Sequence, residues 1–287
     1  MPELSVVVVN FNAGAALEAT LGSLEGGLSG LDWEAVVVDN ASSDGSERRA
    51  EMAGPRVRLL RQPRNGGFAA GVNAGLAATT APDVLILNPD CSVDTGAVRT
   101  LREQLHRWPR CAIVGPRILD PDGQLQESAR GDPNLLTGIF GRTGLLSRLL
   151  PGTRIVRKNL SSQDAIDSGA SSIVVEWVSG ACMLAKRTAL DVVQGFDERY
   201  FLYWEDADLC RRLRTAGWET RYVPAAVVRH QVGQSSRSAP GLANREFHRS
   251  AYRYYVTHVV PQPWHPGRAV AWALLTVRAA VKAVARS

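Results

Sequence analysis

The chain begins with a regular alternation of apolar, β-branched runs and helical segments. The first run, Leu4–Val9, is almost wholly apolar, which is typical of a strand buried on both faces in a parallel sheet. Further strands are predicted at Glu34–Val38, Val57–Arg61, Val84–Leu87 and Ala112–Gly115, with helices between them at Ala15–Leu24, Ser46–Ala53, Phe68–Ala78 and Thr95–Arg107. This alternation predicts an α/β fold, with a mostly parallel sheet flanked by helices.

Polar residues follow three of the predicted strands. Asn10 and Asp39 come directly after the first and second strands, and Asp90 ends the Asn88-Pro89-Asp90 segment after the fourth. In parallel sheets of this kind, ligands bind beyond the carboxyl ends of the strands. We therefore expect Asn10, Asp39 and Asp90 to converge on one edge of the sheet.

Composition narrows the classes of protein that need to be considered. The net charge of +5 is not concentrated in one tract, which disfavours a dedicated nucleic-acid binder. The four cysteines (Cys91, Cys111, Cys182 and Cys210) lack metal-like spacing, which argues against a zinc site and is typical of the reducing cytoplasm. No run of about 20 apolar residues is present, so no transmembrane helix is predicted.

A short acidic segment, Glu205 to Asp208, opens a predicted helix. Leu209 and Leu213 form the apolar stripe of this helix, so Glu205, Asp206 and Asp208 fall in its first turn, where the helix dipole favours negative charge. A carboxylate held there beside aromatic rings suits a general base that takes a proton from a sugar hydroxyl. An acidic first turn is also a common structural feature, and the segment alone leaves both interpretations open.

A second helix begins in the glycine-rich stretch from Asn65 through Gly66 and Gly67 to Asn73. Small residues let a ligand approach the backbone closely, and the N-terminus of a helix attracts phosphate. The stretch is not G-x-G-x-x-G and does not follow the first strand, which disfavours a dinucleotide-binding dehydrogenase.

Asp39, Asp90 and His230 are the strongest individual candidates for ligand contacts. A carboxylate at Asp39 can accept from the N–H of a base or from a ribose hydroxyl, whereas the alternative is an ordinary turn residue. Asp90 is the best candidate for a metal ligand, because one carboxylate and substrate phosphates commonly hold Mg²⁺ or Mn²⁺, whereas the alternative is a turn residue at the end of a strand. His230 ends a later strand, and a single histidine there is also compatible with a structural role.

The chain beyond about residue 120 is less regular. An irregular stretch between about residues 120 and 172 includes the apolar segment Leu135–Leu150, which is expected to be functional or mobile. At the C-terminus, Pro266–Ser287 predicts a helix with Arg278, Lys282 and Arg286 on one basic stripe. Such a helix can lie in a membrane interface, and the alternative is that it docks on its own domain.

Taken in order, these motifs resemble the inverting nucleotide-sugar glycosyltransferases of family 2, which have the GT-A fold. The matching segments are Val6–Asn12, Val38–Gly45, Asn65–Phe68, Asn88–Asp90, Ser179–Cys182, Gly195–Glu198, Trp204–Leu209 and Val228–His230. The sequences of these motifs are most similar to those of the bacterial rhamnosyltransferases, which use dTDP-L-rhamnose in cell-envelope glycan synthesis. The resemblance implies a GT-A domain over residues 1–232, with a nucleotide-sugar half (1–118) and an acceptor half (119–232), and a helical extension over 233–287.

The resemblance also implies roles for the donor-binding residues. Asp39 would read the base of the nucleotide, while Asp90 and His230 would hold Mg²⁺ or Mn²⁺ on the diphosphate. The remaining donor-binding residues would be Asn10, Asn12, Asn65, Gly66, Gly67, Asn73 and Asn88. Many relatives carry Asp-x-Asp where this chain has Asn88-Pro89-Asp90, which leaves the metal requirement less firmly implied.

On the acceptor side, Asp206 would be the general base, while Glu205, Trp204 and Gly180 would position the acceptor. The expected acceptor is a lipid-linked or polysaccharide glycan, bound by a cytoplasmic enzyme in peripheral contact with the inner face of the cell membrane. A UDP-hexose or UDP-GlcNAc donor, a homodimer and a catalytically silent sugar- or nucleotide-binding protein remain open. The presence of the whole acidic set in this chain weighs against the silent alternative.

Overall fold

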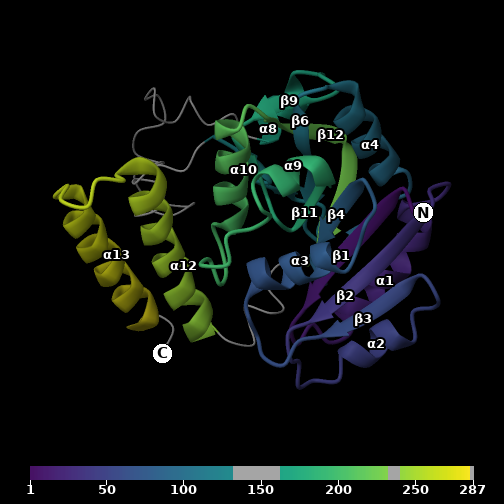
Figure 1. The fold of residues 1–287 in the computed structure, drawn as a ribbon, viewed down its shortest axis with the longest axis horizontal. Coiled ribbons are helices and arrows are strands. Elements are labelled where there is room, and N and C mark those ends of the chain that lie inside the picture. The colour runs from purple at the N-terminus through teal and green to yellow at the C-terminus, as the bar shows by residue number, and fades with distance from the viewer. Residues whose placement is uncertain (132–161, 232–239, 285–287) are drawn as a thin grey trace.

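The computed structural model describes residues 1–131, 162–231 and 240–284, and a single mixed sheet organises most of them (Figure 1). The sheet order is β3 (Val57–Arg61), β2 (Trp33–Asp39), β1 (Leu4–Asn10), β4 (Asp83–Leu87), β11 (Cys182–Lys186), β6 (Cys111–Leu119), β12 (Glu219–His230) and β5 (Cys91–Val93). β1 to β4, β6 and β12 run in one direction, while β11 and β5 run against them. The predicted α/β fold with a mostly parallel sheet is therefore confirmed.

Short strands extend this sheet. β7 (Leu125–Gln126) pairs with β6, and β9 (Ile173–Val175) pairs with β12. A separate small ladder joins β8 (Ala129–Arg130) to β10 (Trp177–Val178). These pairings place the residues that flank 132–161 beside β6 and β12. The Leu135–Leu150 segment itself lies outside the described residues.

Helices cover both faces of the sheet, which explains why β1 is apolar at nearly every position. Val6 and Val8 face one core, while Val7 and Val9 face the other. The first core receives α1 (Ala16–Gly27), α2 (Glu47–Glu51) and α4 (Ala97–Arg107). The second receives α3 (Phe68–Ala77), α8 (Ser162–Asp167), α9 (Arg187–Val192) and α10 (Glu205–Thr215). Continuous burial on both faces is the environment that the apolar run predicts.

The later strands differ in one respect from the sequence pattern. Apolar runs over 220–223 and 226–229, each short enough to suggest its own strand, form one strand in the structure, β12, with a register shift between Val223 and Val227. Pro224 lies in that shift, where a residue without a backbone N–H costs no ladder hydrogen bond. The pairing of β12 with β6 and β5 carries His230 to the same edge as Asp90.

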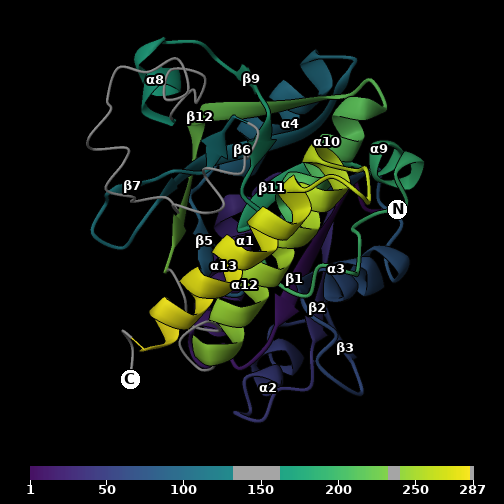
Figure 2. The same ribbon diagram turned by 90° about the vertical axis from the view of Figure 1, so that its left-hand side faces the viewer.

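The C-terminal segment forms α12 (Pro240–Tyr254), a π-helical turn η1 (Tyr255–Val259) and α13 (Gly267–Val284), and α13 packs along α12 (Figure 2). Arg278 and Lys282 lie over the ring of Phe247 in α12; Arg278 is partly buried there, whereas Lys282 stays exposed. Another side of α13 exposes a stripe of aliphatic residues at helical spacing, formed by Val270, Leu274, Val277 and Val281. Arg286 lies outside the described residues.

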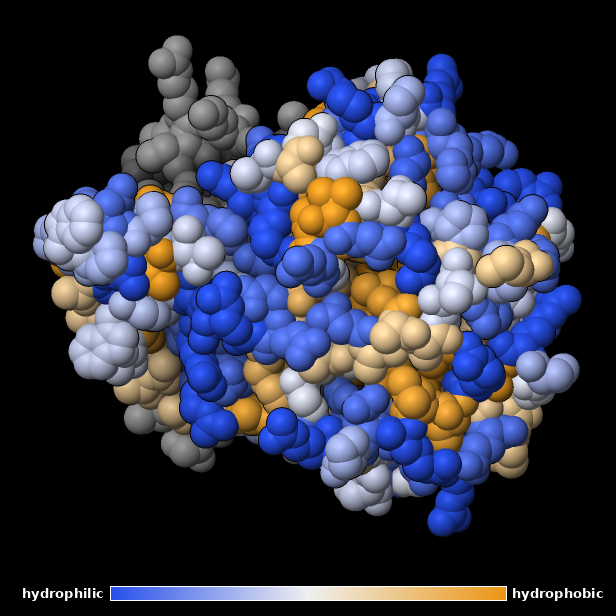
Figure 3. All heavy atoms as spheres, in the orientation of Figure 1, coloured by the Kyte–Doolittle hydropathy of each residue, from blue (hydrophilic) through white to orange (hydrophobic). Residues whose placement is uncertain are grey.

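Neither α13 nor another described helix is long and apolar enough to span a membrane. The surface over α13, at the left-hand edge of Figure 3, mixes apolar and weakly polar residues. One side of α13 is docked on the rest of the C-terminal segment through the buried residues Ala271 and Leu275. The aliphatic stripe lies outside this contact and faces the solvent.

Candidate active site

The ends of β1 and β2 meet at the sheet edge, as the strand pattern predicts. Asn10 pairs in register with Asp39, and the Asn10 amide Nδ2 donates to Asp39 Oδ1 at 2.8 Å. The same amide is within hydrogen-bonding distance of Ser42 Oγ and Ser46 Oγ. Asn10 is fully buried, whereas Asp39 keeps 3% of its surface exposed. Asn10 therefore acts behind Asp39 and fixes its carboxylate.

Asn12 shapes the loop that follows β1. Its backbone N–H donates to Ser42 Oγ at 3.0 Å, and its side-chain Oδ1 accepts from the Ser43 N–H at 2.8 Å. A positive φ of 51° at Asn12 is consistent with the tolerance of asparagine for left-handed conformations. Asn12 thus joins the β1 and β2 loops beside Asp39.

The glycine-rich stretch before α3 is approached by the protein's own backbone. Asn65 Oδ1 accepts from the Gly67 N–H, and Asn40 Nδ2 donates to the Gly67 carbonyl, both at 2.9 Å. Gly67 has φ of 90°, and a Cβ there would lie 2.3 Å from the carbonyl oxygen of Phe201. A Cβ at Gly66, by contrast, would meet the Ala70 side chain, at 3.2 Å, and no backbone among the described residues. The need for glycine at 67 therefore comes from the loop that leads into α10.

Asn73 lies on the same helix but is bound to a distant loop. Its Nδ2 donates to the Phe196 carbonyl and to Glu198 Oε1, and its Oδ1 accepts from the Phe196 N–H, each at 2.9 Å. These contacts occupy the amide within the protein. Asn73 therefore joins α3 to the loop at Gly195–Glu198, and a direct nucleotide contact would have to compete with these bonds.

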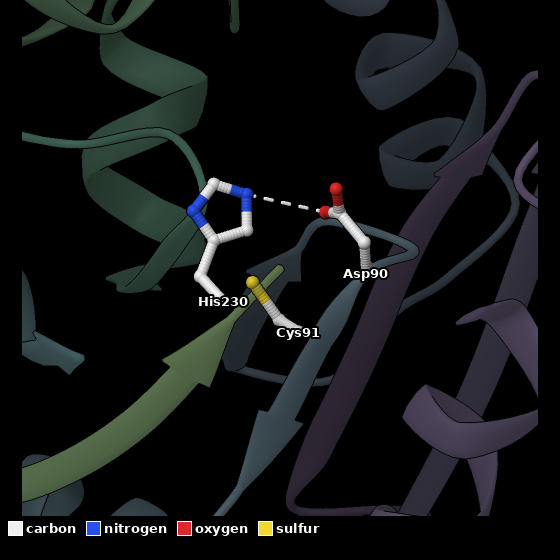
Figure 4. A group of neighbouring side chains, drawn as sticks. All are labelled: Asp90, Cys91 and His230. Carbon is white, nitrogen blue, oxygen red and sulfur yellow. Dashed lines mark ion pairs between the residues drawn. The ribbon is translucent and has the colours of Figure 1, made fainter. Parts of the chain in front are cut away.

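Asp90, Cys91 and His230 come together where β5 pairs with the end of β12 (Figure 4). Their ligand atoms all lie within 4.8 Å of one another. His230 Nε2 is 3.2 Å from Asp90 Oδ1, and both side chains are largely buried. The predicted pairing of Asp90 with His230 is therefore present in the geometry, although the two residues are far apart in sequence.

Gln126 determines how the His230 ring presents its nitrogens. Gln126 Nε2 donates to the His230 carbonyl at 2.9 Å, which orients the amide so that its Oε1 lies 3.0 Å from His230 Nδ1. Because Oε1 can only accept, Nδ1 carries a hydrogen, and Nε2 faces the carboxylate. Such an imidazole nitrogen beside a carboxylate oxygen fits a divalent cation.

Cys91 does not fit that cation. Burial raises the pKa of its thiol well above the usual value, and its Sγ donates to the Ala181 carbonyl at 3.4 Å. A protonated thiol is a poor ligand, since metals bind the thiolate, and Mg²⁺ prefers oxygen. The donor set that suits Mg²⁺ or Mn²⁺ is therefore Asp90 with His230.

The three carboxylates at the start of α10 have different environments. Glu205 and Asp208 are 6% and 1% exposed, whereas Asp206 is partly exposed. Asp206 Oδ2 accepts from the Gly180 N–H at 2.9 Å, and Oδ1 accepts from the Ala207 N–H at 2.8 Å. Asp206 is thus the member of the three that is fixed in orientation and open to a ligand.

A backbone bridge connects Asp206 to the Asp90 side of the site. Gly180 bonds to Asp206, and the next residue, Ala181, accepts from the Asn88 N–H at 2.8 Å. A Cβ at Gly180 would lie 3.4 Å from the Asp206 Cβ and 3.5 Å from the Phe68 ring. The Gly180–Ala181 backbone therefore lies between the predicted general base and the Asn88-Pro89-Asp90 segment.

Glu205 is the least solvated of the three acids. Burial, followed by repulsion from Asp206, raises the pKa of Glu205 well above its usual value of 4.5. Its Oε2 atom is buried without a hydrogen-bond partner in the described structure. This environment favours the neutral acid, which can donate a hydrogen bond but is a poor base.

Trp204 contacts the C-terminal helices. Its ring lies 5.9 Å from that of Phe247 and 5.4 Å from that of Tyr254, measured between centroids. The ring is partly buried in this cluster. Trp204 therefore links the start of α10 to α12.

Sequence reasoning did not identify Ser42, Ser46, Gln126 or His258 as site residues. Ser42 and Ser46 support Asn10, Gln126 orients His230, and His258 bonds to Asp208. Ser42 belongs to the Asp39 turn motif and Ser46 follows it directly, so both could have been included on that signal. Gln126 and His258 reach the site from positions more than 45 residues away in sequence, and no local pattern marks them.

Family models match most of the chain. Residues 5–164 match glycosyl transferase family 2, and residues 159–252 match the description glycosyltransferase like family 2. The chain belongs to glycosyltransferase family 2. It is 36% identical over 260 residues to the N-acetylglucosaminyl-diphospho-decaprenol L-rhamnosyltransferase of Mycobacterium tuberculosis. The aligned region covers 87% of this chain and 82% of that relative. The prediction of a family 2 glycosyltransferase similar to the rhamnosyltransferases is confirmed.

Other relatives agree with this assignment. Rhamnosyltransferase WbbL of Escherichia coli is 42% identical over 84 residues, or 29% of this chain and 32% of that protein. Among solved structures, the mannosyltransferase PcManGT from Pyrobaculum calidifontis, in complex with GDP-Man and Mn²⁺, matches with a TM-score of 0.60 at 15% identity. That match covers 100% of this chain and 76% of the other, and it confirms the GT-A fold.

Proposed function

We propose that this glycosyltransferase transfers L-rhamnose from dTDP-L-rhamnose to a hydroxyl of a lipid-linked or polysaccharide acceptor, with inversion at the anomeric carbon. The observation that carries the mechanism is the placement of Asp206, the partly exposed acid of α10, which is hydrogen-bonded to Gly180. The choice of sugar and acceptor is supported by the relative from Mycobacterium tuberculosis, whose name describes rhamnosyl transfer to a lipid-linked N-acetylglucosamine.

In this proposal, Asp206 removes the proton from the acceptor hydroxyl as the oxygen attacks the anomeric carbon. Both carboxylate oxygens accept a backbone hydrogen bond, which fixes the orientation of the group beside the acceptor site. Attack on the face opposite the departing nucleotide inverts the anomeric centre. The transition state has the oxocarbenium-like character known for glycosidic carbons.

The donor lies over the edge formed by β1, β2 and β4. Asp39 accepts from the imide N–H of the base, while Asn10 holds its carboxylate from behind. Asn12, Asn65, Gly66 and Gly67 shape the nucleotide pocket, and Asn88 reaches a ribose hydroxyl. Asn73 contributes by holding the α3 side of the pocket to the loop at Gly195–Glu198.

Asp90 and His230 would hold a divalent ion, Mg²⁺ or Mn²⁺. The orientation of the His230 ring by Gln126 and the 3.2 Å separation from Asp90 support this assignment. Such an ion would neutralise charge on the diphosphate leaving group.

Glu205 serves the acceptor as a neutral hydrogen-bond donor. Its raised pKa keeps a proton available beside Asp206, so that the two neighbouring acids take different roles. Trp204 and Gly180 complete the acceptor side of the site.

We also place the enzyme in the cytoplasm, at the inner face of the cell membrane. The support is the exposed aliphatic stripe of Val270, Leu274, Val277 and Val281 on α13, together with the lipid-linked substrate named for the relative. An amphipathic helix with such a stripe lies in the membrane interface without crossing it.

The donor assignment is tested by isothermal titration with dTDP-L-rhamnose, UDP-GlcNAc and UDP-glucose, each with and without Mn²⁺. Selective binding of dTDP-L-rhamnose that strengthens with Mn²⁺ supports the proposal. Preference for a UDP-sugar would retain the fold and the base but replace the donor. Absence of binding by all three would contradict the donor assignment.

A further inference from the structure

The backbone directly before the catalytic turn is strained. Tyr203 and Trp204 have φ of 68° and 71°, and both are non-glycine residues in the left-handed region. Such conformations are costly and persist only where the surrounding structure imposes them. Trp204 is followed at once by Glu205 and Asp206, so whatever imposes this strain also determines where Asp206 points.

α12 packs against Tyr203 and Trp204. The Tyr203 and Trp204 rings lie 5.8 Å and 5.9 Å from the ring of Phe247, in edge-to-face arrangements. Ser250 Oγ donates to the carbonyl of Leu202 at 3.0 Å. α12 therefore contacts three consecutive residues, 202 to 204, immediately before the catalytic turn.

η1 makes a short polar contact with the first turn of α10. His258 Nε2 donates to Asp208 Oδ1 at 2.6 Å, and Arg212 Nε donates to Asp208 Oδ2 at 2.7 Å. Asp208 is 1% exposed, so each of its oxygens depends on one of these partners. π-helical turns often occur at functional sites, and this one brings His258 to α10.

Arg212 extends the network to the opposite side of α10. Its Nη1 donates to the carbonyls of Val193 and Gly195 at 2.8 Å and 2.9 Å. Asp208 thus lies between a fixed arginine on its own helix and a histidine from the C-terminal segment. Loss of His258 would leave the carboxylate tied only to the Arg212 side, and the first turn of α10 could then rotate.

We propose that His258 is a positioning residue: its bond to Asp208 fixes the first turn of α10 and thereby aims Asp206 at the acceptor hydroxyl. The proposal rests on the proposed function, because it takes Asp206 to be the general base. His258 acts through Asp208 and contacts no reacting group. The C-terminal helices are then part of the catalytic unit as well as an attachment to it.

The test compares His258→Leu, which removes the donor, with His258→Gln, whose amide can still donate to Asp208. His248→Leu is the matched control, because His248 is a buried histidine on α12 that bonds to the Asn244 carbonyl and not to α10. For each full-length variant, kcat, donor KM, donor affinity and the thermal midpoint are measured. These readouts separate misplacement of Asp206 from general loss of structure.

We expect His258→Leu to lower kcat by about 10- to 100-fold, the cost of a displaced catalytic group, while donor affinity stays within about twofold. His258→Gln should recover most of that loss. His248→Leu should keep kcat near the wild-type value, even if its thermal midpoint falls by as much as that of His258→Leu. Equal kcat for His258→Leu and wild type, or equal losses in His258→Leu and His248→Leu, would overturn the proposal.

Asp206→Asn separates this proposal from the function beneath it. If Asp206 is the base and His258 acts through it, His258→Leu should add little to the defect of Asp206→Asn, because residues that act as a unit are not additive. Full activity of Asp206→Asn would refute the proposed function. An inactive Asp206→Asn beside a fully active His258→Leu would refute only the positioning role.

Discussion

Replacement of Glu205 by glutamine is expected to stabilise the protein, and the gain should grow with pH. Glu205 is 6% exposed, and burial raises its pKa well above 4.5. The folded state therefore holds this proton more tightly than the unfolded chain does. The stability associated with the neutral acid is complete below about pH 4.5 and is lost as the pH rises toward the folded-state pKa.

The size of the effect follows from the linkage. While the folded state holds one more proton than the unfolded state, stability falls by up to about 1.4 kcal/mol for each pH unit. Glutamine has nearly the same shape and cannot ionise, so Glu205→Gln should escape this fall. The difference in unfolding free energy between the variant and the wild type should therefore widen from pH 5 to pH 7 at up to that slope.

The assay is urea denaturation at several pH values in EDTA, with Glu103→Gln as a control for the loss of one surface carboxylate. Glu103 is exposed on α4, away from the site. A difference for Glu205→Gln that stays constant with pH, or that turns against the variant as pH rises, would refute the reasoning. It would show that Glu205 is ionised and stabilised in the folded state.

Three further predictions follow from other parts of the structure. Gly67→Ala should destabilise the protein by about 1–3 kcal/mol in urea denaturation, because of its positive φ and the 2.3 Å approach of a Cβ to the Phe201 carbonyl; an unchanged midpoint would contradict that contact. Cys91→Ala should retain Mn²⁺-stimulated donor hydrolysis, since the buried thiol is not a ligand; loss of stimulation with the fold intact would add Cys91 to the metal site. Val277→Asp should weaken binding to anionic vesicles in a flotation assay. The control is Met52→Asp, which changes an exposed residue far from α13 in sequence. Equal binding by the two variants would contradict the interfacial role of α13.

Local sequence patterns predicted the scaffold and its polar edge. The runs at β1 and β2 indicated buried parallel strands, and their register places Asn10 beside Asp39, as strand ends in one sheet should lie. The spacing of Leu209 and Leu213 placed the acids in the first turn of α10, where they are found. These features depend on the periodicity of apolar residues and on where a strand or helix ends, and both can be recognised within a short stretch of sequence.

Contacts between distant segments could not be read in this way. Gly67 looked like a place for a ligand, but the carbonyl of Phe201 occupies the space where its Cβ would lie. The amide of Asn73 is bonded to a loop more than 120 residues later. The sequence left open whether the basic stripe of the C-terminal helix meets a membrane or docks on its own domain; in the structure the Arg278 guanidinium packs over the ring of Phe247, a cation–π contact between distant segments.

The most direct test of the account is rhamnosyl transfer by Asp206→Asn, measured in a single turnover together with donor affinity. The account predicts donor binding close to that of the wild type and transfer reduced by at least about 100-fold, because the acceptor hydroxyl loses its general base. Transfer at the wild-type rate, with donor affinity unchanged, would contradict it and would move the base to another group.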